Sequence, residues 1–404
     1  MSVSTVHSRR LESVSLALLA ALPVLMAIAN RSAAAVITIA GVLSLVAFVA
    51  RGERLRDALP PRGPALYAGL AFIGWAIVSL LWSHAPRTSL FVMAEAGLPF
   101  IGGVLLLLTL PAQWPARFIK AAALAFAAAC ILIIVELLLG LASREALGLR
   151  AQTFIFNRPV MLLLMLFFPL SIHMVRAGWR AWAFVLGALL IVTIEIATSG
   201  AAMLGLLLSA PAFLVALWSR RLGMIIAAAM LGGSLLLAPV KGDLLDALMP
   251  PRLIERLESV HAADRIEIWQ DFAAALHQRP LTGAGFGTSA RMAEAPFAAD
   301  LPPDRGRLLA AGHPHDGFLQ IWAELGFIGA ILAALCGYFI LRALARRDDR
   351  MVAAGVASMV AAAAVVSVFH GAWQGWWVGA LMATTVWCSR QTAPSPASRQ
   401  PKIP

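Results

Sequence analysis

The chain has 404 residues, of which 60% are hydrophobic and 13% are charged, and its formal net charge is +11. Soluble domains are about 45–50% apolar and about 25% charged, so this composition excludes an ordinary soluble protein. The apolar residues gather in runs of roughly 17–25 residues, the length that a helix needs to cross a bilayer, and they lack the short alternation of a membrane β-barrel.

Twelve such runs predict an all-α polytopic membrane protein, because a helix pairs its backbone polar groups internally. Spans one to nine lie within residues 1–239, and spans ten to twelve lie within residues 317–390. The predicted spans cover residues 14–30, 33–50, 64–83, 89–110, 118–142, 159–175, 181–198, 200–218, 222–239, 317–341, 351–369 and 373–389. Residues 391–404 are rich in Pro, Ser and Gln and are predicted to form a disordered cytoplasmic tail.

The lysines and arginines predict how these spans are oriented. If the N-terminus is cytoplasmic, the short cytoplasmic segments hold 19 of them and the short outer loops hold 5. Short loops rich in Lys and Arg stay on the cytoplasmic side, so both termini are predicted to be cytoplasmic and the long segment 240–316 to lie outside. The positive charge is therefore a signal of topology, and no nucleic-acid partner is expected.

Residues 240–316 are too polar to cross a membrane and are predicted to form a helical loop domain between spans nine and ten. One helix is expected over residues 252–260. A second starts near Asp264 and stops at Pro280, and the helical spacing of its apolar residues predicts that it lies on an apolar surface. These residues are Ile266, Trp269, Phe272, Ala273 and Leu276. The glycines within residues 283–287 then predict a flexible turn.

Arg265 lies in the first turn of that second helix. An arginine there opposes the helix dipole, but together with the free backbone N–H groups of the helix N-terminus it makes an anion-binding site. The structural alternative is a solvent-facing arginine that pairs with Asp264 or Glu258.

The most informative local pattern is His313-Pro314-His315-Asp316, which closes the loop where the chain re-enters the membrane and leads on to Gln320. A neutral imidazole at the membrane boundary can take a proton from a hydroxyl near neutral pH. The structural alternative is that Asp316 caps the following helix and that one histidine only fills the interface. Two histidines at this spacing are a weak metal signal, so neither a metal nor another cofactor is expected.

Four glutamates are predicted to lie in the outer half of the bilayer, where a charged group is costly and faces a cavity or a partner. They are Glu95, Glu136, Glu195 and Glu324. For most of them we expect pairing with outer-face arginines such as Arg158. In either case they mark a polar chamber that opens outward.

The histidine segment resembles the bacterial O-antigen ligase and polymerase superfamily, with the ligase branch favoured. O-antigen ligases have a His followed by Asn, Ser or Gln, then nine residues, Gly, two residues, and Gly, Thr or Tyr. Here His315 is followed by Asp316, nine residues, Gly326, two residues and Gly329. Asp316 is the departure, because the family has an amide or a hydroxyl at that position.

The upstream stretch is also similar to the family's Arg…Trp…Pro-Leu-x-Gly-x-Gly pattern, from Arg265 and Trp269 to the segment 280–285. Family members often carry a Ser-Arg pair at the outer start of a middle span. The chain has Thr198-Ser199-Gly200 there, so this arginine is missing, and Arg158 is its expected replacement.

The resemblance implies a glycosyltransferase of the polyprenyl-phosphate class in the bacterial inner membrane, with its active site on the periplasmic face. The donor would be a polysaccharide on undecaprenyl pyrophosphate, and the acceptor would be a sugar hydroxyl of lipid A–core. The leaving pyrophosphate is already a stable anion, so arginines would hold it while a base activates the acceptor hydroxyl. The resemblance requires no metal, nucleotide sugar or other cofactor.

The same resemblance implies residue roles. Arg265 would bind the pyrophosphate, and His315 would be the base, with His313 as the second candidate. Arg158, beside Asn157 at the outer end of span six, would be a further phosphate contact. Other substrate contacts are expected from Asp316, Gln320 and His370. For His370 the alternative is a place in an interfacial aromatic belt.

Two alternatives stay open. Within the superfamily, the chain would be an O-antigen polymerase or a protein O-oligosaccharyltransferase. Polymerases often carry two arginine-rich outer loops, and residues 143–158 form the candidate for a second one. From another class, a multispan transporter or flippase would relay ions through the glutamates. Transporters often show repeats with interrupted helices, and we find no such repeat in the sequence.

Overall fold

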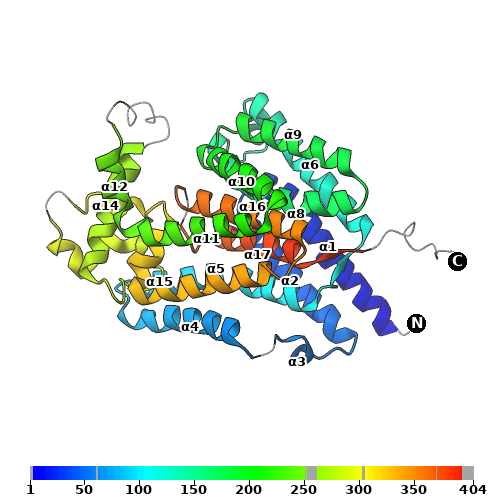
Figure 1. The fold of residues 1–404 in the computed structure, drawn as a ribbon, viewed down its shortest axis with the longest axis horizontal. Coiled ribbons are helices and arrows are strands. Elements are labelled where there is room, and N and C mark those ends of the chain that lie inside the picture. The colour runs from blue at the N-terminus through cyan, green and yellow to red at the C-terminus, as the bar shows by residue number, and fades with distance from the viewer. Residues whose placement is uncertain are drawn as a thin grey trace.

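The structure of the chain, a computed structural model, describes residues 3–60, 62–250, 252, 262–302, 305–369 and 371–393. Long helices run side by side along the long axis of the molecule (Figure 1). Helices α12 (Lys241–Leu248) and α14 (Ala262–Gln278) lie at one end, and the start of α1 (Val3–Ile28) and strand β2 (Gln391–Thr392) lie at the other. The helix predicted over residues 252–260 lies outside the described residues, except for residue 252.

The remaining elements are helices, apart from one further short strand. From α2 to α8 they are α2 (Ala33–Ala50), α3 (Leu55–Ala58), α4 (Pro64–Val78), η1 (Ser79–Trp82), α5 (Pro86–Thr109), β1 (Gln113–Trp114), α6 (Ala116–Leu138), α7 (Ala142–Ala146), η2 (Thr153–Phe156) and α8 (Asn157–Arg176). From α9 onward they are α9 (Arg180–Ile196), α10 (Gly200–Trp218), α11 (Arg220–Leu237), η3 (Ala238–Val240), η5 (Ser289–Glu294), η6 (Pro296–Asp300), η7 (Leu309–Ala311), α15 (Gly317–Leu344), α16 (Asp349–Val366) and α17 (Gly375–Ser389).

Ten helices of the described chain are long and apolar enough to cross a membrane, which agrees with an all-α polytopic membrane protein. Two further predicted spans are shorter helices, α9 with 17 residues and α17 with 15 residues. Each predicted span thus corresponds to a helix, but the count of twelve membrane crossings stays a prediction.

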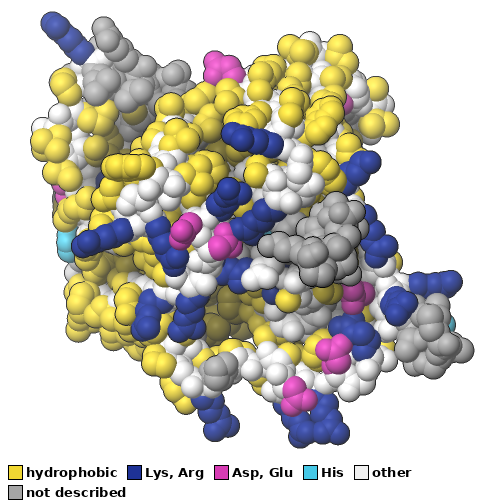
Figure 2. All heavy atoms as spheres, turned by 45° about the vertical axis from the view of Figure 1, so that its right-hand side comes forward, with side chains coloured by type: hydrophobic (Ala, Val, Ile, Leu, Met, Phe, Trp, Pro, Cys, Tyr) yellow, Lys and Arg dark blue, Asp and Glu magenta, His cyan; other side chains and the backbone are white. Residues whose placement is uncertain are grey.

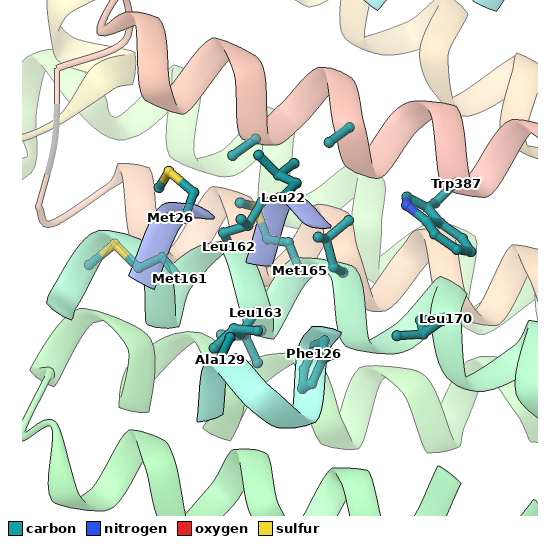
Figure 3. Close-up of a cluster of buried hydrophobic side chains, with 14 of the residues drawn as sticks. Leu22, Met26, Phe126, Ala129, Met161, Leu162, Leu163, Met165, Leu170 and Trp387 are labelled. Atoms are coloured by element: carbon teal, nitrogen blue, oxygen red, sulfur yellow. The ribbon is translucent and has the colours of Figure 1, made fainter. Parts of the chain in front are cut away.

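Helix α8 forms the centre of the bundle. Of its 20 residues, 15 are buried, as expected for a helix that is apolar on every side. Figure 3 shows side chains of α1, α6 and α17 packed around it. They are Leu22, Met26, Phe126, Ala129 and Trp387. The first residues of α8, Asn157 and Arg158, are therefore carried by a rigid element.

The outer surface of the bundle is apolar along its flanks. Figure 2 turns the end that carries β2 forward, and Lys and Arg side chains gather over that end while hydrophobic side chains cover the flanks. Trp218 is 82% exposed and Phe184 is 70% exposed. Large contiguous apolar surfaces are rare on soluble monomers, so these flanks fit contact with lipid.

The long loop packs on the N-terminal part of α15. Helix α14 ends just before Pro280, and the five residues predicted to form its apolar face are all buried. Three of them, Ile266, Trp269 and Phe272, share a core with Leu319 and Ala323 of α15. The prediction that this helix lies on an apolar surface is therefore confirmed.

Helix α15 is interrupted at Gly326, whose φ of 65° and ψ of −164° are not helical. The segment 280–285 lies against the interruption and pairs the backbone groups that it frees. The hydrogen bonds run from Ala284 N to Ala323 O (2.9 Å), from Gly285 N to Glu324 O (2.8 Å) and from Phe327 N to Pro280 O (2.8 Å). Non-helical backbone at membrane depth is tolerated where protein groups satisfy it, as they do here.

Glycine is required on both sides of this contact. A Cβ at Gly326 would lie 2.4 Å from the carbonyl carbon of Leu281, and a Cβ at Gly283 would lie 2.3 Å from the carbonyl carbon of Glu324. Both glycines also have positive φ, which side chains rarely allow. The predicted flexible turn is therefore held tightly against α15.

The beginning of the predicted disordered tail is ordered. Gln391 and Thr392 form β2, which pairs in parallel with β1. The N–H of Gln391 donates to Ala112 O, and the N–H of Ala393 donates to Trp114 O, both at 3.0 Å. Residues 394–404 lie outside the described residues.

Candidate active site

His313 and His315 lie in the turn between η7 and α15. Gly312 and His315 both have positive φ, 89° and 50°. This conformation is unusual for a residue with a side chain, costs about 1–3 kcal/mol and is typical of functional sites. The turn brings the two imidazole centroids within 4.2 Å of each other.

The hydrogen bonds of the two rings assign opposite tautomers. Nδ1 of His315 lies 3.1 Å from the carbonyl oxygen of Phe369, which can only accept, so this nitrogen carries the proton. In the neutral ring Nε2 of His315 then has a free lone pair. Nδ1 of His313 accepts the backbone N–H of His315 at 3.1 Å, so the proton of neutral His313 lies on Nε2. His315 therefore presents an acceptor at Nε2 and His313 a donor.

Both imidazoles are held neutral. Burial, with smaller contributions from His315 and Arg158, lowers the pKa of His313 to about 3. Burial also lowers the pKa of His315, against the effect of the Phe369 carbonyl, and the charge of Arg265 contributes to the lowering. The charge of Arg158 thus acts on His313, and the charge of Arg265 acts on His315.

Arg265 is half-buried in the first turn of α14. Burial lowers the pKa of its guanidinium, and its charge acts on both His315 and Lys241. Of the two acidic partners considered for it, Asp264 is exposed, and Glu258 lies outside the described residues. The structure therefore brings Arg265 into the electrostatic surroundings of the histidine turn.

Arg158 follows Asn157, the first residue of α8, and both are half-buried. Its guanidinium carbon lies 5.5 Å from the ring centroid of Trp376 in α17, a cation–π contact. The charged groups that act on it are Arg31, Arg150 and Glu95. Glu95 accepts the N–H of Gly375 at 3.2 Å, so it joins α5 to the start of α17.

Asp316 and Gln320 are engaged inside the protein. Asp316 caps α15: its Oδ1 accepts the N–H groups of Phe318 (2.8 Å) and Leu319 (3.1 Å), as the capping alternative predicted. Gln320 donates to Glu324 at 2.8 Å and accepts the N–H of Ala372 at 2.7 Å. Their polar atoms support the histidine turn, so a direct substrate contact is harder for them than for the histidines.

The prediction that the intramembrane glutamates pair with arginines is wrong for Glu324, whose hydrogen-bond partners among the described residues are all uncharged. Its carboxylate is fully buried and accepts four neutral N–H groups from the loop, from α15 and from the approach to α17. The donors are Gly287 N (2.5 Å), Ser289 N (3.1 Å), Gln320 Nε2 (2.8 Å) and Trp373 Nε1 (2.7 Å). Hydrogen bonds to the charged form are the stronger kind, so Glu324 ties these segments together.

The other two predicted glutamates lie on α6 and α9. Glu195 is exposed on α9, and Oε2 of Glu136 is buried without a partner in the part of the chain that is described. His370 lies outside the described residues, although its neighbour Phe369 contacts His315. No three His, Cys, Asp or Glu side chains converge as a metal-binding group within the described ranges.

Sequence reasoning missed Lys241, whose ammonium pairs with the Asp316 carboxylate from 75 positions away. The available signal was an ionisable residue at the end of an apolar helix, which by default marks a functional position. It also missed the carbonyl of Phe369, because backbone partners of a side chain leave no trace in sequence.

Residues 182–334 match the protein family described as O-antigen ligase. This stretch includes Arg265, the histidine turn and the interruption of α15. A "Putative polysaccharide ligase" from Rickettsia bellii (strain RML369-C) is 27% identical over 210 residues, which are 51% of this chain and 49% of the relative, so the chain aligns with about half of that protein. A second protein of that name, from Rickettsia felis (strain ATCC VR-1525 / URRWXCal2), is 24% identical over 321 residues, 76% of each chain.

Proposed function

Because the chain belongs to the O-antigen ligase superfamily, we propose that it is a glycosyltransferase with a lipid-linked donor. It moves a polysaccharide from undecaprenyl pyrophosphate to a sugar hydroxyl of lipid A–core. The reaction takes place at the periplasmic face of the bacterial inner membrane, with both termini in the cytoplasm.

The free Nε2 lone pair of His315 carries this proposal, together with the charges of Arg158 and Arg265, which act on His313 and His315 respectively. A neutral base in the electrostatic surroundings of guanidinium groups suits a reaction in which a hydroxyl is deprotonated and a pyrophosphate leaves. Bidentate guanidinium contacts are well matched to phosphate oxygens.

The proposed mechanism is a single displacement. The acceptor oxygen bonds to the anomeric carbon of the donor while the bond from that carbon to the pyrophosphate oxygen breaks. The hydroxyl proton passes to Nε2 of His315, and the pyrophosphate leaves as an anion beside Arg265 and Arg158. The N–H at Nε2 of His313 is placed to donate to a substrate oxygen. In this scheme the chain needs no cofactor.

Reconstituted transfer tests the proposal. Purified protein is mixed with undecaprenyl-pyrophosphate-linked polysaccharide and lipid A–core, and the product is followed by gel. We expect His315→Ala to lower the rate by about 10²–10⁴, the usual loss for a general base. His313→Ala is expected to lose less, and Arg265→Lys to lose part of the rate because Lys lacks the bidentate fork. Gel filtration controls the fold, and a wild-type rate for His315→Ala would show that the base lies elsewhere.

An O-antigen polymerase is the second candidate. It is favoured by a basic cluster in which the charges of Arg31 and Arg150 act on Arg158. The side chain of Asn30 donates to Ile155 O at 3.0 Å, and Arg144 donates to Ile28 O at 3.3 Å, so the α1–α2 turn lies against residues 144–158.

A deletion strain separates the two functions. Loss of a ligase leaves bare lipid A–core while lipid-linked polymer accumulates, whereas loss of a polymerase leaves core with single units.

A further inference from the structure

Lys241 is a largely but not fully buried cation at the point where four helices meet. It begins α12, and its side chain is 18% exposed. Its Nζ forms an ion pair with Asp316, the cap of α15, whose side chain is 1% exposed. Nζ also donates to the carbonyl of Ser367 after α16 at 2.8 Å and lies 3.6 Å from the ring centroid of Trp269 in α14.

These three contacts use the whole donor capacity of Lys241. An ammonium group has three N–H bonds, and here one faces a carboxylate, one a carbonyl and one an aromatic ring. None is left to hold a phosphate of the substrate. A direct contact with the leaving group is therefore a poor explanation for this lysine, although it lies in the electrostatic surroundings of Arg265.

The contacts of Lys241 converge on His315 by two routes. Asp316 is the next residue after His315, so the ion pair anchors the chain directly behind the left-handed turn. Ser367 lies two positions before Phe369, whose carbonyl holds Nδ1 of His315. Lys241 thus fixes both the backbone of His315 and the segment that sets its tautomer.

We propose that Lys241 is a positioning residue for the base: with Asp316 it locks the histidine turn, so that Nε2 of His315 faces the substrate. This inference rests on the proposed function for its catalytic part only. The Asp316 carboxylate is buried and the Lys241 ammonium mostly so, and therefore removing one partner leaves the other uncompensated, whereas removing both together does not. Asn at position 316 keeps the helix cap, and Met at position 241 keeps much of the length of the lysine side chain.

The test is a double-mutant cycle in the full chain purified in detergent, with Lys241→Met, Asp316→Asn and the double variant. Arg291→Met is the matched control, because Arg291 is a loop cation whose ion pair with Glu294 is exposed. The first readout is the rate at which diethyl pyrocarbonate modifies His315, followed by peptide mass spectrometry. This measurement needs no substrate.

We expect each single variant to change the modification rate of His315 by at least about threefold and the double variant to change it about as much as either single variant, since all three lose the same ion pair. Arg291→Met should match wild type. If the single variants leave the rate unchanged, or if the double variant is as far from wild type as the sum of the two, Lys241 does not position His315. If the single variants do not fold, the double variant still decides: a folded double with an altered modification rate supports the lock, and an unfolded double or one with the wild-type rate overturns it.

The second readout is transfer activity per folded protein. The single variants should lower kcat by about 10–10² while KM stays within about twofold, because a misplaced base slows the chemical step without weakening binding. A merely structural lysine would instead lower the folded fraction and leave kcat unchanged. If His315 responds to the variants as expected but the wild-type protein transfers no polysaccharide, the proposed function is wrong and the positioning role of Lys241 stands.

Discussion

The backbone conformation of His315 bears on which nitrogen of its ring is free to accept a proton. A φ of 50° turns the ring back toward the carbonyl of Phe369, and that carbonyl leaves the lone pair on Nε2. Burial lowers the pKa of the ring, so it stays neutral without a carboxylate partner. A base of this kind is weak but is always in its working form at neutral pH.

We predict that activity has an acid limb below pH 6.5, the ordinary pKa of histidine. Because the pKa of His315 is lowered, its imidazole keeps the lone pair at pH values where a free histidine is already protonated. Activity is therefore lost only when the pH falls below the ordinary range of histidine. The pH dependence of kcat/KM between pH 4 and 8 checks this, with His277→Ala as a control because His277 is exposed. A midpoint above 6.5 would contradict a buried neutral base.

Glu324 gives a second prediction for a single residue. Glu324→Gln places an NH2 group where N–H donors already point, so at least one buried donor loses its partner, at a cost of about 1–3 kcal/mol. We expect a lower midpoint of thermal unfolding in detergent. Glu195→Gln, on the exposed side of α9, is the matched control and should leave the midpoint unchanged. Equal midpoints of thermal unfolding for the two variants would mean that the hydrogen bonds of Glu324 do not stabilise the fold.

At the scale of elements, α15 was predicted as one span and is two helices joined at Gly326. Hydropathy counts apolar residues and does not register a break whose polar backbone groups are paired by another segment. The glycines of the motif were visible in the sequence, but their reason is a contact between residues 280–285 and 323–328 that only the structure supplies. The capping role of Asp316, in contrast, is a local property and was predictable.

Substitutions of glycine within α15 test this contact. Gly326→Ala should destabilise the protein by several kcal/mol or prevent folding, because the Cβ meets the backbone of Leu281 and φ is positive. Gly337→Ala in the same helix meets nothing within 4 Å and should fold as well as wild type. Yield and thermal stability in detergent measure both. A stable Gly326→Ala variant would refute the tight contact.

At the scale of the whole molecule, charge and hydropathy were enough to predict an all-α membrane protein, and ten helices bear this out. The site was less accessible to prediction. His313, His315 and Arg265 were chosen because their residue types and motif suit the chemistry, whereas Lys241 and Phe369 reach the turn across 75 and 54 positions of chain. Such pairings depend on how helices meet, and a single sequence contains no record of that.

Topology is the prediction for the whole chain. A cysteine placed at Ala299, an exposed position of the loop, should react with a membrane-impermeant maleimide in cells whose outer membrane is permeable to it. A cysteine at Asp57, which is exposed in α3 at the expected cytoplasmic side, should react only after lysis. The three native cysteines are replaced beforehand. The reverse pattern would invert the proposed orientation.

The interruption of α15 also has a consequence for how the protein is made. The segment that pairs its freed backbone groups precedes α15 in the chain, so on the proposed topology the ribosome delivers it to the far side of the membrane first. The outer half of α15 can then dock onto a template that is already exported, instead of waiting in lipid with unpaired peptide groups. On the proposed topology, export of the loop thus precedes and assists the insertion of this helix, so the order of the two segments in the chain favours folding.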